Sequence, residues 1–62
     1  MLSTEHAHVL VASGNRQYTF LPCGEEVTIR YLGPRHNTET VVPVVEARDL
    51  WSRLLKRGFK KW

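Results

Sequence analysis

The sequence 46-EARDLWSRLLKRGFKKW-62 decides the fold of this 62-residue chain. Its apolar residues recur at the spacing of a helix with one buried stripe, at Ala47, Leu50, Trp51, Leu54 and Leu55. Gly58 follows as a stop, because glycine readily enters the left-handed conformation that ends helices. We therefore expect a helix over about residues 45–57, with Trp51 in the core.

Upstream of this helix, the sequence predicts three β-strands, at residues 6–12, 17–21 and 26–32. These segments are short, and they are β-branched or alternate polar with apolar residues. The turns between them are Ser13-Gly14-Asn15-Arg16 and Pro22-Cys23-Gly24-Glu25, rich in residues that favour turns. Three strands joined by two tight turns predict an antiparallel meander.

The turn residues also predict a register. Centring the first loop on Gly14-Asn15 pairs Val9 with Phe20, and centring the second on Cys23-Gly24 pairs Phe20 with Val27. Both registers place the same apolar set on one face, namely Val9, Val11, Tyr18, Phe20, Val27 and Ile29. The other face is then mixed, with three leucines, Leu10, Leu21 and Leu32. We expect the helix to cover the first face and the leucines to mark a contact surface.

The segment between the meander and the helix leaves alternatives open. Residues 33–39 read as a loop that begins with Gly-Pro. Residues 40–44 are extended, since Pro43 holds Val42 out of the helical region, and they form either a fourth edge strand or the lead-in to the helix. Residues 59–62 either add a short strand or fray. The expected fold class is α+β: one small domain, a three-stranded meander covered on one face by a C-terminal helix, with residues 1–5 disordered.

Composition limits the class of protein. A chain of 62 residues buries little surface, so a partner subunit is a common source of added stability. Cys23 is the only cysteine, which excludes a disulfide within the monomer and fits a reducing cytoplasm. No leader peptide and no apolar run of about 20 residues is present, so we expect no membrane insertion.

The sequence offers little catalytic or metal-binding chemistry. His6 and His8, with Cys23 or His36, lack the paired ligand spacing of zinc sites, so no metal and no cofactor is expected. Glu25 and Glu26 flank the Cys23 turn and would oppose formation of a thiolate. No paired carboxylates or glycine-rich phosphate loop suggest an active site or a small-molecule substrate. The expected protein is not an enzyme.

Positive charge gathers at the C-terminal end and supplies the candidate binding residues. The chain carries a net charge of +3, and most of its cations follow residue 47. The electrostatic candidates are Arg48, Arg53, Lys56, Arg57, Lys60 and Lys61. Trp62 is the candidate aromatic anchor, since tryptophan and arginine often dominate binding energy. A small accessory or regulatory protein that docks on a larger protein, or on a second copy of itself, fits these features best. The alternative is a nucleic-acid-binding domain that uses the same basic face.

The C-terminal stretch resembles a group of small uncharacterised cyanobacterial proteins. These end in a helix with the pattern Glu-Ala-Arg-x-Leu-Trp, two leucines, Gly-Trp or Gly-Phe with basic residues, and a final tryptophan. The resemblance covers residues 46–62, and the matching positions are Glu46, Ala47, Arg48, Leu50, Trp51, Leu54, Leu55, Gly58, Phe59 and Trp62. It implies a small cytosolic domain and transfers no functional site.

Overall fold

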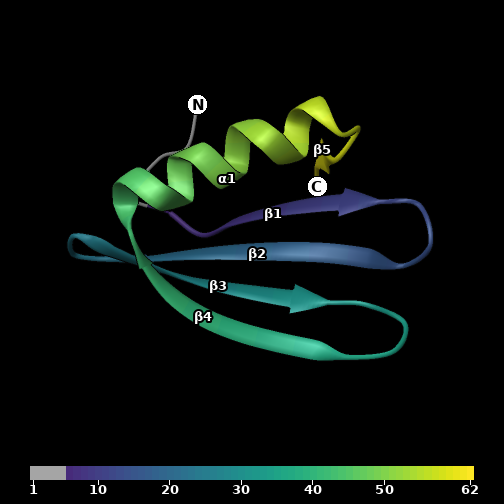
Figure 1. Ribbon diagram of the computed structural model, residues 1–62, viewed down its shortest axis with the longest axis horizontal. Coiled ribbons are helices and arrows are strands. Elements are labelled where there is room, and N and C mark those ends of the chain that lie inside the picture. Colours follow the sequence, from purple (N-terminus) through teal and green to yellow (C-terminus); the bar gives the residue numbers. More distant parts are fainter. Residues whose placement is uncertain (1–5) are drawn as a thin grey trace.

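A computed structural model describes residues 6–62, so the expectation for residues 1–5 lies outside the described part. It contains one helix and five strands in this part of the chain (Figure 1). The elements are β1 (His8–Ala12), β2 (Arg16–Cys23), β3 (Glu26–Leu32), β4 (Asn37–Pro43), α1 (Val44–Lys56) and β5 (Lys60–Lys61). The chain is therefore α+β, as the sequence predicted.

All the strands belong to a single antiparallel sheet. Their order is β4-β3-β2-β1-β5, and the helix lies over one face (Figure 1). The predicted meander forms the centre of this sheet, and the two segments whose fate the sequence left open supply its edges. The prediction of three strands, with a possible fourth, was therefore too low.

The predicted register of the first hairpin is wrong by one residue. His8, not Val9, pairs with Phe20, because Ser13 joins Gly14 and Asn15 in the loop and Ala12 pairs with Arg16. Gly14 and Asn15 both take positive φ, of 79° and 59°, so the turn residues were identified correctly. A slip of one residue turns every side chain to the opposite face. The buried residue of β1 is therefore Leu10, while Val9 and Val11 point away from the helix.

The second hairpin differs from its prediction by two residues and so keeps the predicted face. Phe20 pairs with Ile29, and Pro22 pairs with Val27. The loop is Gly24-Glu25, with glycine at positive φ in the first position, as a type II′ turn requires. Pro22 is tolerated inside β2 because β1 pairs only as far as Phe20, so no strand on that side needs its missing N–H.

The fourth strand is longer than predicted. β4 begins at Asn37 and pairs with β3 as far as Pro43 opposite Glu26, so the loop covers only residues 33–36 instead of 33–39. Pro43 occupies the N-cap position of α1 in an extended conformation. The N–H of Val44 donates to the carbonyl oxygen of Glu25 at 3.0 Å, which attaches the start of the helix to the β2–β3 turn.

The core lies between α1 and the strands beneath it. Eight apolar residues are buried there, namely Leu10, Phe20, Val27, Ile29, Ala47, Trp51, Leu54 and Phe59. The expected position of Trp51 in the core is confirmed, and its ring meets Phe20 edge-on at 5.2 Å. Leu50 packs against the core from its margin. Leu55 was wrongly placed in the buried stripe: 42% of its surface is exposed, because it lies at the flank of the stripe instead of under the helix.

The helix ends at Lys56, and Gly58 stops it as predicted, in a Schellman motif. Gly58 has φ of 102°, its N–H donates to Leu55, and the N–H of Phe59 donates to Leu54. The chain then turns back toward the sheet, where β5 pairs with β1. Residues 59–62 therefore join the structure instead of fraying.

Candidate functional site

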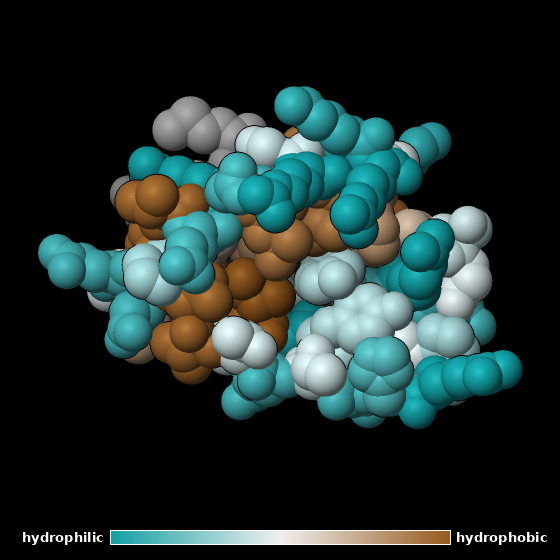
Figure 2. Space-filling view, in the orientation of Figure 1, coloured by the Kyte–Doolittle hydropathy of each residue, from teal (hydrophilic) through white to brown (hydrophobic). Residues whose placement is uncertain are grey.

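A groove runs between α1 and the β3–β4 side of the sheet. A helix is about 10 Å across, whereas strands at about 4.8 Å spacing make a five-stranded sheet nearly twice as wide, so one helix leaves part of the face uncovered. The open part has a volume of about 470 Å³. It is lined by Tyr18, Ile29, Tyr31, His36, Thr38, Thr40, Val42 and Leu50. Figure 2 shows the hollow below the helix, with apolar surface gathered toward the N-terminal end of α1.

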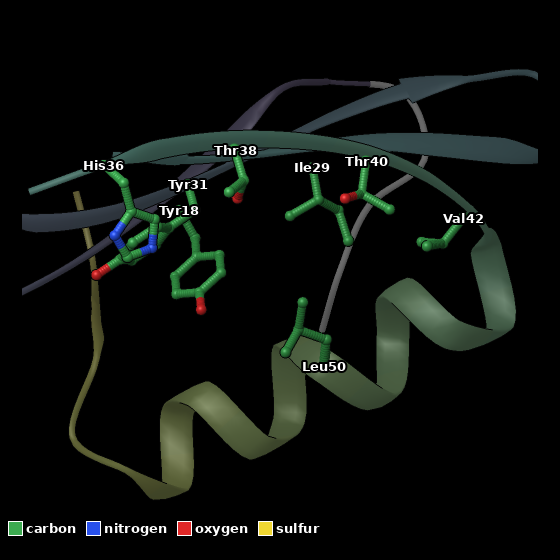
Figure 3. Close-up of a pocket in the computed structure, with 8 residues that line it drawn as sticks. All are labelled: Tyr18, Ile29, Tyr31, His36, Thr38, Thr40, Val42 and Leu50. Atoms are coloured by element: carbon green, nitrogen blue, oxygen red, sulfur yellow. The ribbon is translucent and has the colours of Figure 1, made fainter. Parts of the chain in front are cut away.

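The groove has an apolar end and a polar, aromatic end. In Figure 3, Leu50 projects from the helix toward the sheet residues Ile29, Thr40 and Val42. At the other end, the rings of Tyr18 and Tyr31 lie 4.8 Å apart, and His36 lies 5.6 Å from Tyr31. A ligand in this groove would therefore meet aliphatic side chains, threonine hydroxyls and aromatic rings in turn.

The absence of a side chain at Gly33 leaves the space that the Tyr31 ring occupies at the edge of the groove. A Cβ atom on Gly33 would lie only 2.6 Å from the Tyr31 hydroxyl and 2.8 Å from its ring. The backbone of Gly33 is not in the left-handed region, so the requirement here is for space. Any larger residue at this position has to displace the Tyr31 ring.

A second hollow, of about 340 Å³, shares Tyr18 and Tyr31 with the groove and is basic. Leu54 and Phe59 form its apolar side, and Arg16 and Arg57 bring two guanidinium groups to it. Arg16 is held in place, because its Nε donates to the carbonyl oxygen of Ser13 at 3.1 Å and its guanidinium lies 5.5 Å from the centre of the Phe59 ring. The two hollows adjoin at Tyr18 and Tyr31, and the two guanidinium groups make the second hollow favour negative charge.

The outer side of the groove is a free strand edge. β4 pairs with β3 on one side, and no other strand in residues 6–62 pairs with its outer side. Thr38, Thr40 and Val42 alternate into the groove from this strand. Edge strands present unpaired N–H and C=O groups that can bond to another extended chain. The groove and the free edge therefore lie side by side.

The predicted basic residues of the helix and its C-cap are all exposed. They are Arg48, Arg53, Lys56 and Arg57. Arg53 is paired with Asp49 at 2.8 Å, one helical turn away. Arg57 also lines the basic hollow, so it is the residue of this set that the structure brings next to the groove.

The predicted tail residues are divided between the two faces of the sheet. Lys61 pairs with Leu10 and lies on the helix side, where its ammonium group is 5.9 Å from the centre of the Trp51 ring. Lys60 pairs with Val11 and therefore lies on the opposite side. Trp62 follows, with its N–H bonded to Val9 and 89% of its surface exposed. The candidate anchor Trp62 and the basic helix surface thus do not form one continuous site.

His8, His36 and Cys23 lie in different parts of the fold. His8 packs edge-on against Trp51 at 5.5 Å, His36 lies beside Tyr31, and Cys23 is exposed next to the β2–β3 turn. Burial lowers the pKa of His8, and the positive charges of Lys61 and His6 lower it further. In residues 6–62, His, Cys, Asp and Glu side chains form no cluster of three that could hold a metal ion.

Sequence reasoning missed the groove because it assigned residues 37–39 to a loop. The signal available was Thr38, Thr40 and Val42, which alternate with outward-facing residues as a strand requires. Gly33 beside Tyr31 also indicates a close approach of a ring to the backbone, although only the structure identifies the ring. Arg16 could not be connected to Arg57 without the tertiary fold.

The comparisons with known proteins give no match. No protein-family model matches the chain, and no curated protein or solved structure matches it significantly. In the described part of the chain, the helix is too short and too polar to cross a membrane.

Proposed function

We propose that this chain is a small, non-enzymatic protein-interaction module that binds an extended segment of a partner protein along β4. The observation that carries this proposal is the position of the groove directly beside a free strand edge. The bound segment would add a strand to the sheet, a common way in which domains recognise peptides.

The geometry supports an extended ligand over a compact one. Side chains of a strand alternate between the two faces of a sheet, so every second residue of the added segment would point into the groove. The main chain would bond to the edge of β4, and the side chains would pack against Thr40, Val42 and Leu50. The main-chain bonds would supply affinity and the groove would supply selectivity.

The groove and the adjoining basic hollow specify the chemistry of the segment. An aliphatic side chain suits the end formed by Ile29, Val42 and Leu50. A carboxylate suits the basic hollow, where Arg16 and Arg57 can each donate hydrogen bonds. The expected ligand is therefore an extended segment with an apolar residue at one end and an acidic residue at the other.

Selection from a library of random displayed peptides on the immobilised protein tests the proposal. The enriched peptides should share an apolar residue and an acidic residue that lie two or four positions apart in the sequence, so that both side chains point to the same face of the added strand. Thr40→Lys should abolish binding of these peptides, because the new side chain fills the groove and charges it. Ser52→Lys is the matched control: it replaces another exposed hydroxyl on the outer surface of α1 and should leave binding unchanged.

Two results would argue against this function. One is a library that yields no common pattern. The other is a set of peptides whose affinity falls equally with Thr40→Lys and Ser52→Lys, since that would indicate attraction to the whole surface.

Nucleic-acid binding is a second candidate, favoured by the hollow in which Arg16 and Arg57 meet Tyr18 and Tyr31. Guanidinium groups contact phosphates, and aromatic rings stack on bases. Gel-shift titration with single-stranded DNA and RNA at increasing salt would test it. Affinity that falls steeply with salt, and that is lost with Arg57→Ala, would support this function. The absence of a shift at low salt would eliminate it.

A further inference from the structure

Within residues 6–62, no helix or strand covers the face of the sheet opposite α1, and this face is partly apolar. The strand registers place Val9 and Val11 of β1, Leu21 of β2, Leu32 of β3 and Val41 of β4 on this face. Leu32 and Val41 expose 42% and 55% of their surface. Trp62 lies beside Val9 and Gln17 at the β5 edge. Each of four neighbouring strands thus brings at least one apolar side chain to the same solvent-facing surface.

This face is electrically neutral, whereas the chain as a whole carries +3. The same registers give it two acids, Glu26 and Glu39, and two bases, Arg30 and Lys60. Arg30 and Glu39 neutralise each other directly, in a 2.6 Å contact from Nε to Oε2. Two copies can therefore approach through this face without net repulsion, while the basic outer surface of α1 repels its own copy.

The lack of net charge also indicates which kind of partner binds to this face. A strongly charged partner would be drawn to the basic helix surface rather than to a face with no net charge. A second copy of the chain presents the same neutral, partly apolar surface, and an interface with two-fold symmetry uses the same patch on both subunits.

The size of the face suits a weak or moderate dimer. Four strands of about seven residues, at about 3.3 Å per residue and about 4.8 Å between strands, cover roughly 450 Å². Two such faces bury on the order of 1,000 Å², which is close to the lower limit for a specific interface. Tryptophan is enriched among the residues that dominate such interfaces, and Trp62 adds its exposed ring at the edge.

We infer that this face is the interface of a homodimer, in which two sheets pack face to face and the helices lie outside. The arrangement follows the general solution for exposed sheet faces, two sheets stacked about 10 Å apart. It gives a small chain the added burial that its own length cannot supply. The groove lies on the other side of the sheet, so the dimer leaves it open, and the dimer does not depend on the proposed peptide binding.

Sedimentation equilibrium of the wild-type chain and two matched variants tests the inference. Leu32→Lys places a charge on the sheet face, and Leu55→Lys places the same charge on the helix at an equally exposed leucine, 42% in both cases. The wild-type chain and Leu55→Lys should dimerise with the same dissociation constant. Leu32→Lys should raise that constant by at least about tenfold, and Trp62→Ala should raise it by a smaller factor.

Three results would overturn the inference. The first is a wild-type chain that remains monomeric at about 1 mM, where even weak specific contacts assemble. The second is a dimer that Leu32→Lys leaves intact, which would mean that copies pair through the edge of β4 or through the helix. The third is equal weakening by both lysine variants. Circular dichroism of each variant establishes that loss of the dimer is not loss of the fold.

Discussion

The N–H of Phe59 donates a 3.0 Å hydrogen bond to the carbonyl oxygen of Leu54, and the side chains of both residues are buried in the core. This is the hydrogen bond and the apolar contact of a Schellman motif. It redirects the chain at the end of α1, so that Phe59 meets Tyr18 edge-on at 5.5 Å and β5 reaches β1. The basic hollow beside the groove depends on this turn.

Replacing Gly58 therefore tests the connection between the helix end and the groove. Gly58 has φ of 102°, and a Cβ atom there would contact no other group, so Gly58→Ala introduces backbone strain without a clash. We expect a loss of about 1–2 kcal/mol in the free energy of unfolding, measured with urea. Ser52→Ala, in the middle of the same helix, is the control and should change stability by less than about 0.5 kcal/mol. Equal effects would contradict the assigned helix end.

The two tryptophans provide a matched pair for the core. Trp51 exposes 2% of its surface and Trp62 exposes 89%. Trp51→Ala should lower the free energy of unfolding by about 3–5 kcal/mol, since it removes a large buried side chain. Trp62→Ala should change the stability of the monomer by less than about 0.5 kcal/mol. If Trp51→Ala cost less than about 1 kcal/mol, the assignment of the buried helix face would be wrong.

His8 gives the fold a defined dependence on pH. Burial against Trp51, and then the charges of Lys61 and His6, lower its pKa below the ordinary value of 6.5. The folded state therefore resists protonation of this ring more than the unfolded state does. The stability that the folded state has while His8 is neutral is fully present above pH 6.5. It is lost progressively as the pH falls from 6.5 toward the folded pKa of His8.

Urea unfolding of the wild-type chain and of His8→Asn on both sides of pH 6.5 measures this effect. The wild-type chain should lose more stability on acidification than His8→Asn does. An identical loss in the wild-type chain and in His8→Asn would exclude His8 as the source.

A substitution at Gly33 changes the shape of the groove without placing a new side chain inside it. A methyl group at this position meets the Tyr31 ring, so Gly33→Ala should move that ring and shift the resonances of Tyr31 and His36. Selected peptides should bind less tightly, while stability should fall by less than about 1 kcal/mol, because the side chain that moves is only half-buried. Unchanged aromatic resonances and unchanged affinity would show that Tyr31 does not shape the site.

Local sequence signals predicted most of the elements but not their lateral arrangement. Gly14, Asn15, Gly24 and Gly58 identified the turns and the helix end, because their backbone requirements are local. Whether Ser13 belongs to the first loop depends on small differences in turn energy, yet that residue decides whether Leu10 or Val9 enters the core. The alternating pattern of β1 is apolar on both faces, so composition could not correct the error.

The candidate site depended even more on tertiary structure. β4 is recognisable as a strand because it pairs with β3, whereas alone its threonines and its glutamate resemble a loop. Its neighbour across the groove, Leu50, comes from the helix. The basic end of the chain was visible in the sequence, but the separation of Trp62 from Arg57 by the thickness of the sheet was not.

Amide hydrogen exchange of β4, with and without a library-selected peptide, tests the central claim most directly. If an extended segment adds to this edge, alternate amides in residues 37–43 should become protected when the peptide binds, because alternate N–H groups of an edge strand point outward. The amides of α1 should change little. Binding that protects α1 or β1 and leaves β4 exchanging at its original rate would contradict the account.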